Sequence, residues 1–133
     1  MIIVDDEEKL IESLKVFFKV NDFDVKVFGK AFDAIKYVQA HECDVAICDI
    51  KMPGIKGDRL CSELRKNDPL LQCVVVTAYP EKEIIERLVR MGVTDIHVKP
   101  VGSDVLLAAV NNAYARKKSL KELMRREQEK HEG

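Results

Sequence analysis

No run of apolar residues in this sequence is long enough to cross a membrane, which takes about 18 or more in succession. No basic and apolar leader stands before the first expected strand, so we expect a cytoplasmic protein with no membrane contact. Internal repeats and low-complexity linkers are also missing from residues 1–115. With 133 residues, the chain is long enough for one domain with a hydrophobic core and too short for two.

The sequence has four cysteines but no CxxC pair. Cys43, Cys48, Cys61 and Cys73 follow one another at intervals of 5, 13 and 12 residues. This spacing is not typical of zinc ligands, so it disfavours a zinc site. Two of the four stand inside apolar runs. We therefore interpret the cysteines as small core residues of a protein in a reducing compartment.

An excess of basic residues is also absent, since the net charge is −1. Residues 1–115 hold 15 Lys and Arg against 19 Asp and Glu, whereas residues 116–133 carry a net charge of +3. The basic cluster 116–118 is not accompanied by an aromatic or groove-reading element. We therefore expect no direct binding to nucleic acid, and we expect a tail that differs in character from the body.

Apolar patterns predict five strands that alternate with five helices. Three of the strands, 1–4, 44–48 and 73–77, are apolar on both faces, which indicates a parallel sheet covered by helices on both sides. The other expected elements are strands 24–28 and 95–98, helices 7–20, 31–40 and 57–67, a helix from Pro80 that Gly92 ends, and a helix from Asp104 with Ser103 as its N-cap.

Polar side chains end four of the five expected strands: Asp5 with Asp6, Asp49, Thr77 and Lys99. The carboxyl ends of parallel strands meet at one edge of the sheet, so these side chains should converge there. Three carboxylates repel one another, and one lysine cannot neutralise them, whereas a hard divalent cation can. Each residue alone has a simpler explanation, such as a helix cap or a turn, but together they predict a Mg²⁺ or Mn²⁺ site.

Four segments, VDD (4–6), DIKMPGIKG (49–57), VVVTA (74–78) and VKP (98–100), resemble the motifs of the bacterial response-regulator receiver domain, the CheY-like domain of two-component signalling. The resemblance covers about residues 1–115. It implies a flavodoxin-like, doubly wound sheet of five parallel strands in the order 2-1-3-4-5. It also implies a phosphoprotein that takes part in signal transduction, in some cases within a phosphorelay, and not an enzyme with a separate substrate.

The same resemblance implies a role for each residue at the strand ends. Asp49 would accept a phosphoryl group from a histidine kinase or a histidine phosphotransfer protein. The implied Mg²⁺ ligands are Asp6, Asp49 and the Lys51 backbone carbonyl, with Asp5 acting through water. Thr77 and Lys99 would contact the phosphoryl oxygens, and the Lys99–Pro100 peptide bond would be cis.

The sequence departs from the family pattern at several positions. Ile96 stands where many receivers carry the Tyr or Phe that moves inward after phosphorylation, and Val101 stands where Phe is common. Lys51 and Tyr79 occupy the two positions that flank the path of the hydrolytic water in the family. Because both side chains are long, we predict slow autodephosphorylation, unless both point into solvent.

Three other functions fit parts of the pattern. A flavodoxin would need a Ser/Thr/Gly-rich phosphate loop after the first strand, where this chain has DDEEK. A haloacid dehalogenase-type phosphatase normally has a second Asp two residues after the first, where this chain has Lys51. A pure scaffold with a vestigial pocket would not need the full set of metal and phosphate residues.

Helix-breaking residues are absent between Ser103 and Glu132, and residues 116–130 are mostly strong helix formers. We therefore expect the last helix to run past residue 120, and we divide the chain into a receiver domain (1–115) and a helical extension (116–133) that leads toward an output domain. Leu106, Ala109, Ala113, Leu120 and Leu123 form a short a/d seam in which Arg116 fills one slot. We therefore predict weak pairing with a second copy, through this seam and through the face formed by the fourth helix, fifth strand and fifth helix.

Overall fold

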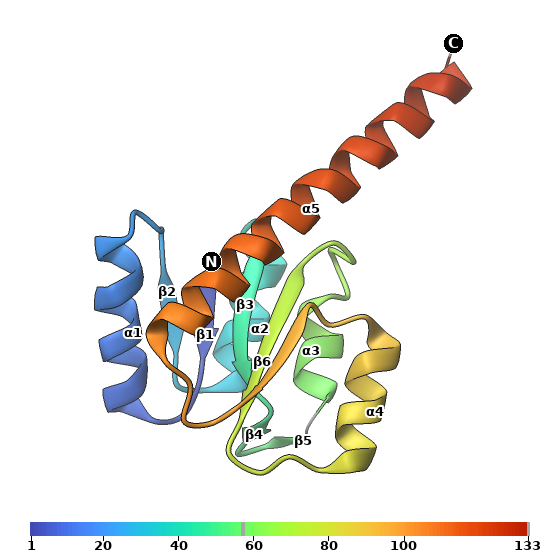
Figure 1. Cartoon of the computed structure of the whole chain (residues 1–133). Coiled ribbons are helices and arrows are strands. Elements are labelled where there is room, and N and C mark those ends of the chain that lie inside the picture. The colour runs from blue at the N-terminus through green and yellow to red at the C-terminus, as the bar shows by residue number, and fades with distance from the viewer. Residues whose placement is uncertain (57, 133) are drawn as a thin grey trace.

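The computed structural model describes residues 1–56 and 58–132, and its centre is a parallel sheet of five strands (Figure 1). The strand order is β2-β1-β3-β6-β7, which confirms the expected order 2-1-3-4-5 because β6 and β7 are its fourth and fifth strands. The strands are β1 (Ile2–Val4), β2 (Lys26–Phe28), β3 (Val45–Asp49), β6 (Gln72–Thr77) and β7 (Asp95–Val98).

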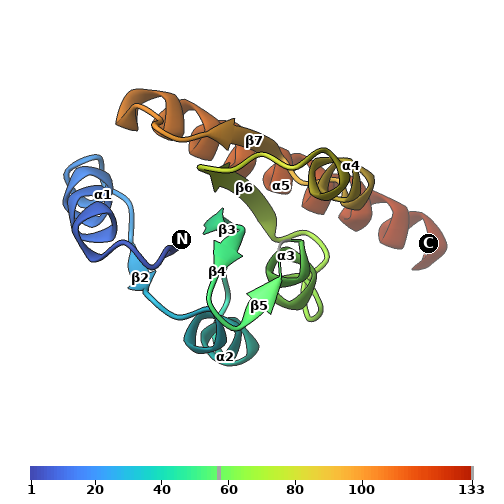
Figure 2. The ribbon, with the colours of Figure 1, turned by 90° about the horizontal axis from the view of Figure 1, so that it is seen from below.

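Five helices cover the two faces of this sheet, α1 and α5 on one and α2, α3 and α4 on the other (Figure 2). Their bounds are α1 (Glu8–Val20), α2 (Ala31–Ala40), α3 (Arg59–Leu64), α4 (Lys82–Met91) and α5 (Ser103–Glu132). Strand β3 is buried along its whole length, as its continuous apolar pattern predicts. The fold thus places β1, β3 and β6 between two hydrophobic cores, with their carboxyl ends together at one edge.

A small antiparallel hairpin follows Asp49, made of β4 (Lys51–Met52) and β5 (Ile55–Lys56). The sequence interpretation had only a loop here, because strands of two residues are too short to show an alternating pattern. The Pro53-Gly54 pair makes the turn, and Gly54 has a φ of 83°, which glycine adopts without strain. The hairpin therefore holds the segment after Asp49 in a defined shape.

Some expected helix boundaries were wrong by one to three residues, the largest difference being the end of α3 at Leu64 instead of residue 67. Helix α4 begins at Lys82, two residues after Pro80, and it ends at Gly92 in the left-handed conformation, as expected. Helix α5 begins at Ser103, and the Leu106 N–H donates to the Gly102 carbonyl, so Ser103 lies in the first turn instead of capping it. Gly57, the expected start of α3, lies outside the described residues, as does Gly133 at the end of the extension.

Helix α5 continues to Glu132, which confirms the expected helical extension. Three of the five expected seam positions, however, are not available to a second copy. Leu106, Ala109 and Ala113 are buried in the domain's own core, because α5 covers the sheet there. Leu123 is 59% exposed, so the free part of the seam is confined to the end of the helix.

Lys117, the middle residue of the basic cluster 116–118, is buried. Its Nζ lies 2.6 Å from Asp68 Oδ2 and 3.0 Å from Asp44 Oδ1, and it donates to the Cys43 carbonyl at 3.2 Å. Burial opposes the charged ammonium, but the hydrogen bonds to Asp68 and Asp44 outweigh it and raise the pKa of Lys117. Lys117 therefore anchors α5 near the amino-terminal ends of β3 and β6, at the opposite end of these strands from Asp49 and Thr77.

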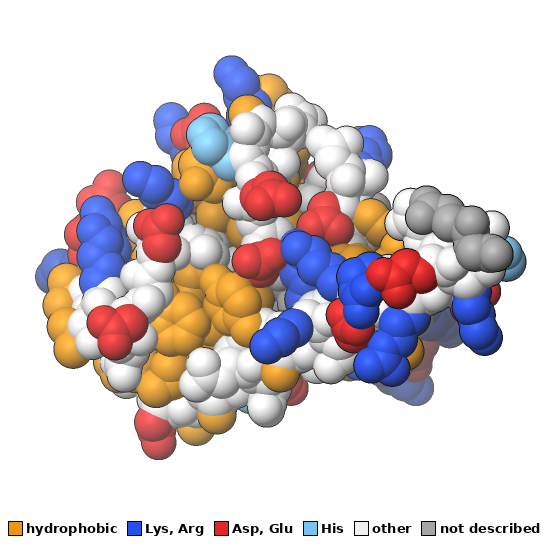
Figure 3. All heavy atoms as spheres, turned by 90° about the horizontal axis from the view of Figure 1, so that it is seen from above, with side chains coloured by type: hydrophobic (Ala, Val, Ile, Leu, Met, Phe, Trp, Pro, Cys, Tyr) orange, Lys and Arg blue, Asp and Glu red, His pale blue; other side chains and the backbone are white. Residues whose placement is uncertain are grey.

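Beyond Lys117, α5 presents charges of both signs, which Figure 3 shows mixed along the end of the helix. Glu122 pairs with Arg126 at 3.2 Å, the i, i+4 pair that the sequence predicts, and also with Arg125. Among the described helices, none combines the length and apolar character that crossing a bilayer requires.

Candidate functional site

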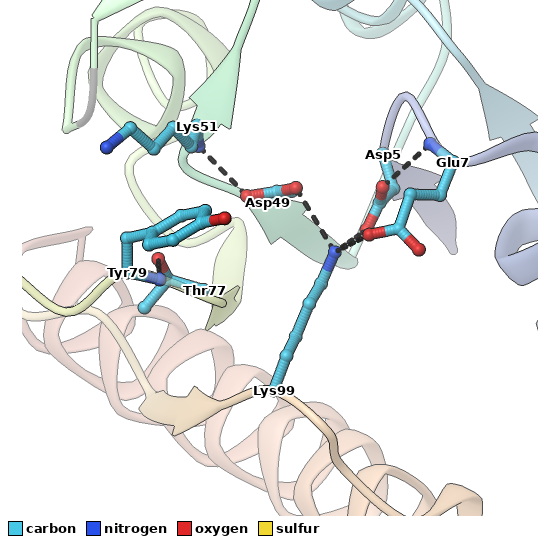
Figure 4. Close-up of polar contacts among 7 residues, drawn as sticks. All are labelled: Asp5, Glu7, Asp49, Lys51, Thr77, Tyr79 and Lys99. Atoms are coloured by element: carbon cyan, nitrogen blue, oxygen red, sulfur yellow. Dashed lines mark hydrogen bonds and ion pairs between the residues drawn. The ribbon is translucent and has the colours of Figure 1, made fainter.

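Asp49 is the last residue of the central strand β3, and its side chain is almost fully buried. One carboxylate oxygen, Oδ1, accepts a hydrogen bond of 2.9 Å from the Lys51 backbone N–H. The other, Oδ2, lies 3.2 Å from the ammonium of Lys99 (Figure 4). The strand and the hairpin after it thus fix the orientation of this carboxylate.

Asp5 directly follows β1 and is only 2% exposed. Its Oδ1 accepts the Glu7 backbone N–H at 3.0 Å, and its Oδ2 lies 2.7 Å from Lys99 Nζ. Burial raises the pKa of Asp5, although the contacts with Lys99 and the Glu7 N–H act in the opposite direction. Asp6, the next residue, is exposed, so the two neighbouring aspartates have very different surroundings.

Lys99 follows β7 and contacts three acidic residues from two parts of the chain, the segment after β1 and the end of β3. Besides Asp5 and Asp49, its Nζ contacts Glu7 Oε1 at 3.1 Å. Burial opposes the charge on Lys99, yet the hydrogen bonds to Asp5 and Glu7 and the charge of Asp49 keep its pKa above the usual value. The Lys99–Pro100 bond is cis, as the resemblance implies.

Glu7 is the residue of this site that the sequence interpretation missed. It belongs to the acidic run 5–8, which was the available signal, but an acidic run does not show which carboxylate turns toward a lysine 92 residues away. The structure decides this because Glu7 precedes α1 as its N-cap residue, beside Asp5. Neither Asp5 nor Asp6 takes that capping position, so the simpler explanation as N-cap residues is wrong for both.

Oxygens of Asp5, Asp6 and Asp49 all lie within 4.8 Å of one another. Carboxylate oxygens are the ligands that Mg²⁺ and Mn²⁺ prefer, so the donor set fits such an ion. Three carboxylates, those of Asp5, Glu7 and Asp49, contact the one ammonium of Lys99, and the Asp6 carboxylate lies close to two of them. The local charge therefore favours a further cation, and Asp5, Asp6, Asp49 and Lys99 lie together at this edge of the sheet.

Thr77 ends β6 and is fully buried, and its Oγ1 accepts the Tyr79 backbone N–H at 3.1 Å. Lys51 and Tyr79 both extend toward solvent on this side of the site. Figure 4 shows Lys51 and Tyr79 on the same side of Asp49, and the Lys51 Nζ lies 4.8 Å from the centre of the Tyr79 ring. The same Nζ lies 3.3 Å from Glu81 Oε1. These two side chains are thus held by each other and by Glu81.

Ile96 lies on β7 opposite Val75, and it is half-buried. It packs against the core on the α4 side of the sheet, with Ile84 and Met91. A branched aliphatic side chain has no ring to move inward and no hydroxyl to exchange partners. This position is therefore filled by ordinary apolar packing in the structure.

The chain is similar to known proteins both in sequence and in fold. The family model described as the response regulator receiver domain matches residues 1–111. The cyclic di-GMP phosphodiesterase of Thermotoga maritima is 30% identical over 85% of this chain, and this chain spans 30% of that relative's length.

Two solved structures share the fold. A CheY-like receiver domain protein of Methanospirillum hungatei has a TM-score of 0.85 at 23% identity, covering 89% of this chain and 94% of its own. A Burkholderia pseudomallei response regulator, described with a phosphorylated aspartic acid, a calcium ion and citrate, has a TM-score of 0.76 at 20% identity, covering 92% and 72%. Because the family model covers most of the chain, the chain belongs to the response regulator receiver domain family.

Proposed function

We propose that this domain accepts a phosphoryl group on Asp49 from the phosphohistidine of a histidine kinase or phosphotransfer protein, in a reaction that needs Mg²⁺ or Mn²⁺, and that it then switches an output domain or partner. One observation carries the proposal. Asp49 lies at the end of the central strand, bonded to the Lys51 N–H and Lys99, with oxygens of Asp5 and Asp6 within 4.8 Å.

In this reaction an Asp49 oxygen attacks phosphorus while the bond from phosphorus to the histidine nitrogen breaks, and the electron pair stays on the imidazole. Phosphoryl transfer depends mostly on positioning and charge neutralisation. The Lys51 N–H holds one Asp49 oxygen in place, and the Lys99 ammonium and Thr77 hydroxyl bind the phosphoryl oxygens. Both side chains stand at the same edge as Asp49, at the ends of β7 and β6.

The metal ligands in this proposal are Asp6, Asp49 and the Lys51 backbone carbonyl, with Asp5 acting through water. A bound divalent ion would neutralise negative charge shared by Asp49 and the incoming phosphoryl group. The calcium ion and phosphorylated aspartate named for the Burkholderia pseudomallei regulator support a joint metal and phosphoryl site in a domain of this fold. Burial and a hydrogen bond to Glu7 N–H fix Asp5 beside that site.

We further propose that residues 1–115 form the receiver unit and that residues 116–133 lead toward an output domain. The relative from Thermotoga maritima is more than three times as long as the matched segment, which supports a multidomain context. The helix to Glu132 would act as a stalk, with weak pairing between copies through its exposed end and the α4–β7–α5 face. The four free cysteines fit a cytoplasmic location.

The test of the acceptor is a mass measurement. The protein is incubated with acetyl phosphate or phosphoramidate in the presence of Mg²⁺, and the intact mass should rise by a single phosphoryl group. The Asp49→Asn variant should gain none, and omission of the metal should prevent the gain in the wild type. A matched control is Asp95→Asn, because Asp95 stands at the opposite end of β7, where it contacts His97. Phosphoryl gain by Asp49→Asn would refute the assignment.

A further inference from the structure

Three of the four cysteines meet inside the core, although they are far apart in the sequence. The Sγ atoms of Cys48, Cys61 and Cys73 all lie within 4.8 Å of one another. Their side chains are free thiols, and the residues are between 0% and 1% exposed. The spacing along the chain gave no sign of this cluster, because each cysteine comes from a different element.

The fold explains why the three sulfurs converge. In the β3–β6 pair, Ala46 lies opposite Cys73 and Cys48 lies opposite Val75, so Cys48 and Cys73 point to the same face two residues apart. Helix α3 packs on that face and brings Cys61 over both strands. The cluster is therefore supported by a rigid sheet and by a helix that is anchored on both sides of Cys61 by the buried Leu60 and Leu64.

The arrangement has the size of a three-sulfur metal site. With a metal–sulfur bond of roughly 2.3 Å, three sulfurs around one ion stand about 4 Å apart. The sulfurs here are within 4.8 Å of one another before any ion is bound, so small side-chain movements would close the site. Soft thiolate ligands select soft metals, in contrast to the oxygen ligands at the carboxyl ends of the strands.

The absence of a fourth ligand narrows the choice of metal. Within residues 1–56 and 58–132, the group contains these three cysteines and no histidine, aspartate or glutamate. Zn²⁺ in structural sites takes four ligands, and burial leaves no open path for water to serve as one. Cu(I) is softer and is satisfied by two or three thiolates. We propose that Cys48, Cys61 and Cys73 form a buried site for a soft, low-coordinate metal ion, for which Cu(I) fits best.

Binding would form copper–sulfur bonds in place of S–H bonds and release the thiol protons to water, with no change in oxidation state. The product carries negative charge, and Arg65 is placed to offset part of it. Arg65 stands one turn after Cys61, and its charge acts on both Cys61 and Cys73. Its Nε is buried and has no hydrogen-bond partner among the described residues. The other guanidinium nitrogens donate to the Met91 and Pro69 carbonyls, so Arg65 offers a positive charge and one unused donor, one helical turn from Cys61.

Cys43 offers a matched control on the same chain. It is also a buried free thiol, but it lies outside the cluster, and its Sγ donates to the Val45 carbonyl at 3.4 Å. If the cysteines were only small core residues, Cys43 and the clustered cysteines would respond to metal in the same way. A specific site requires that they differ.

The experiment refolds the reduced 133-residue chain without oxygen, with Cu(I) supplied as its bicinchoninate complex, and then removes unbound metal by gel filtration. Wild type and Cys43→Ala should each retain a single copper ion per chain and show thiolate-to-copper absorption in the ultraviolet. Cys61→Ala and Cys73→Ser should retain at least tenfold less. Circular dichroism establishes that each variant has refolded, and copper should raise the melting temperature of the wild type and Cys43→Ala alone.

Two results would overturn the proposal. Wild-type protein that leaves the column without copper has no such site, whatever the variants do. Equal copper loss in Cys43→Ala and in the cluster variants would show adventitious thiol binding. A parallel refolding with Zn²⁺ tests the choice of ion, since zinc retained in preference to copper would contradict a three-coordinate site.

Discussion

The ammonium of Lys51 lies 4.8 Å from the centre of the Tyr79 ring, and the two side chains together border the solvent side of the Asp49 site. Hydrolysis of an aspartyl phosphate needs a water molecule in line with phosphorus, and two long side chains in contact hinder its approach. The paired change Lys51→Asn with Tyr79→Ala should therefore shorten the phosphoryl half-life several-fold, measured by the decay of the phosphorylated intact mass.

The control for this prediction is Lys82→Asn, which replaces an exposed lysine on α4 that forms an ion pair with Glu86. It should leave the half-life unchanged. An unchanged half-life in the Lys51 and Tyr79 double variant would show that these two side chains, which both extend toward solvent, leave the path of the water open.

Lys99 neutralises two buried carboxylates, Asp5 at 2.7 Å and Asp49 at 3.2 Å. In Lys99→Met these carboxylates lose their cation, so the free energy of unfolding without metal should fall by about 2 kcal/mol. Added Mg²⁺ should restore more stability to the variant than it adds to the wild type, since the ammonium no longer competes for the same oxygens. Thermal unfolding with and without Mg²⁺ measures both effects.

Weaker Mg²⁺ binding by Lys99→Met than by the wild type would contradict this expectation, because it would mean that the lysine helps to hold the ion. The phosphorylated state of Lys99→Met should be less stable than that of the wild type in either case, since the ammonium is proposed to contact the phosphoryl oxygens. Glu8→Gln, an exposed residue in the first turn of α1, provides a charge control close by.

Asp68 pairs with the buried Lys117 and accepts the Leu70 N–H, and these contacts outweigh its burial and lower its pKa. A lowered carboxyl pKa stabilises the fold above the pKa of the unfolded chain, about 3.9, and this contribution disappears as the pH falls through the folded value. Asp68→Asn should therefore cost about 1 kcal/mol at pH 7, a small value because Asp68 is partly exposed and Asp44 remains beside Lys117.

Chemical unfolding at a series of pH values tests this pair. The difference between wild type and Asp68→Asn should begin to shrink below about pH 4, where Asp68 becomes protonated in the unfolded chain, and should disappear once the folded carboxyl is protonated as well. Glu86→Gln, which removes an exposed partner of Lys82 and Arg90, should change stability much less at every pH. A difference that stays constant down to pH 2 would rule out the ion pair as its source.

The end of α5 leads to a prediction about association. Of the expected seam positions, Leu123 is 59% exposed, and its neighbour Met124 is 58% exposed. So short an apolar strip supports weak pairing at most, and we expect a monomer–dimer equilibrium that beryllofluoride, a phosphoryl mimic, shifts toward dimer. Leu123→Glu should abolish the shift in sedimentation velocity, whereas Lys130→Glu should not. If only monomer is observed at high concentration, both with and without beryllofluoride, the predicted dimer is ruled out.

Most of the site was predictable because each of its main residues follows an apolar strand. Asp5, Asp49, Thr77 and Lys99 could be placed at one edge without knowing any distance, since parallel strands bring their carboxyl ends together. Glu7 could not, because the choice among neighbouring acidic side chains depends on where α1 begins. The β4–β5 hairpin was missed for a related reason, as two-residue strands carry no periodic signal.

The sequence by itself determined the order of the elements, the parallel sheet and the long final helix, because apolar periodicity and helix-breaking residues act over a few neighbouring positions. Tertiary structure alone decided that Lys117 is a buried partner of Asp68 and that Leu106, Ala109 and Ala113 face their own core. It also brought Cys48, Cys61 and Cys73 together. These outcomes depend on how helices and strands pack across long sequence separations, and no local pattern records which residues meet there.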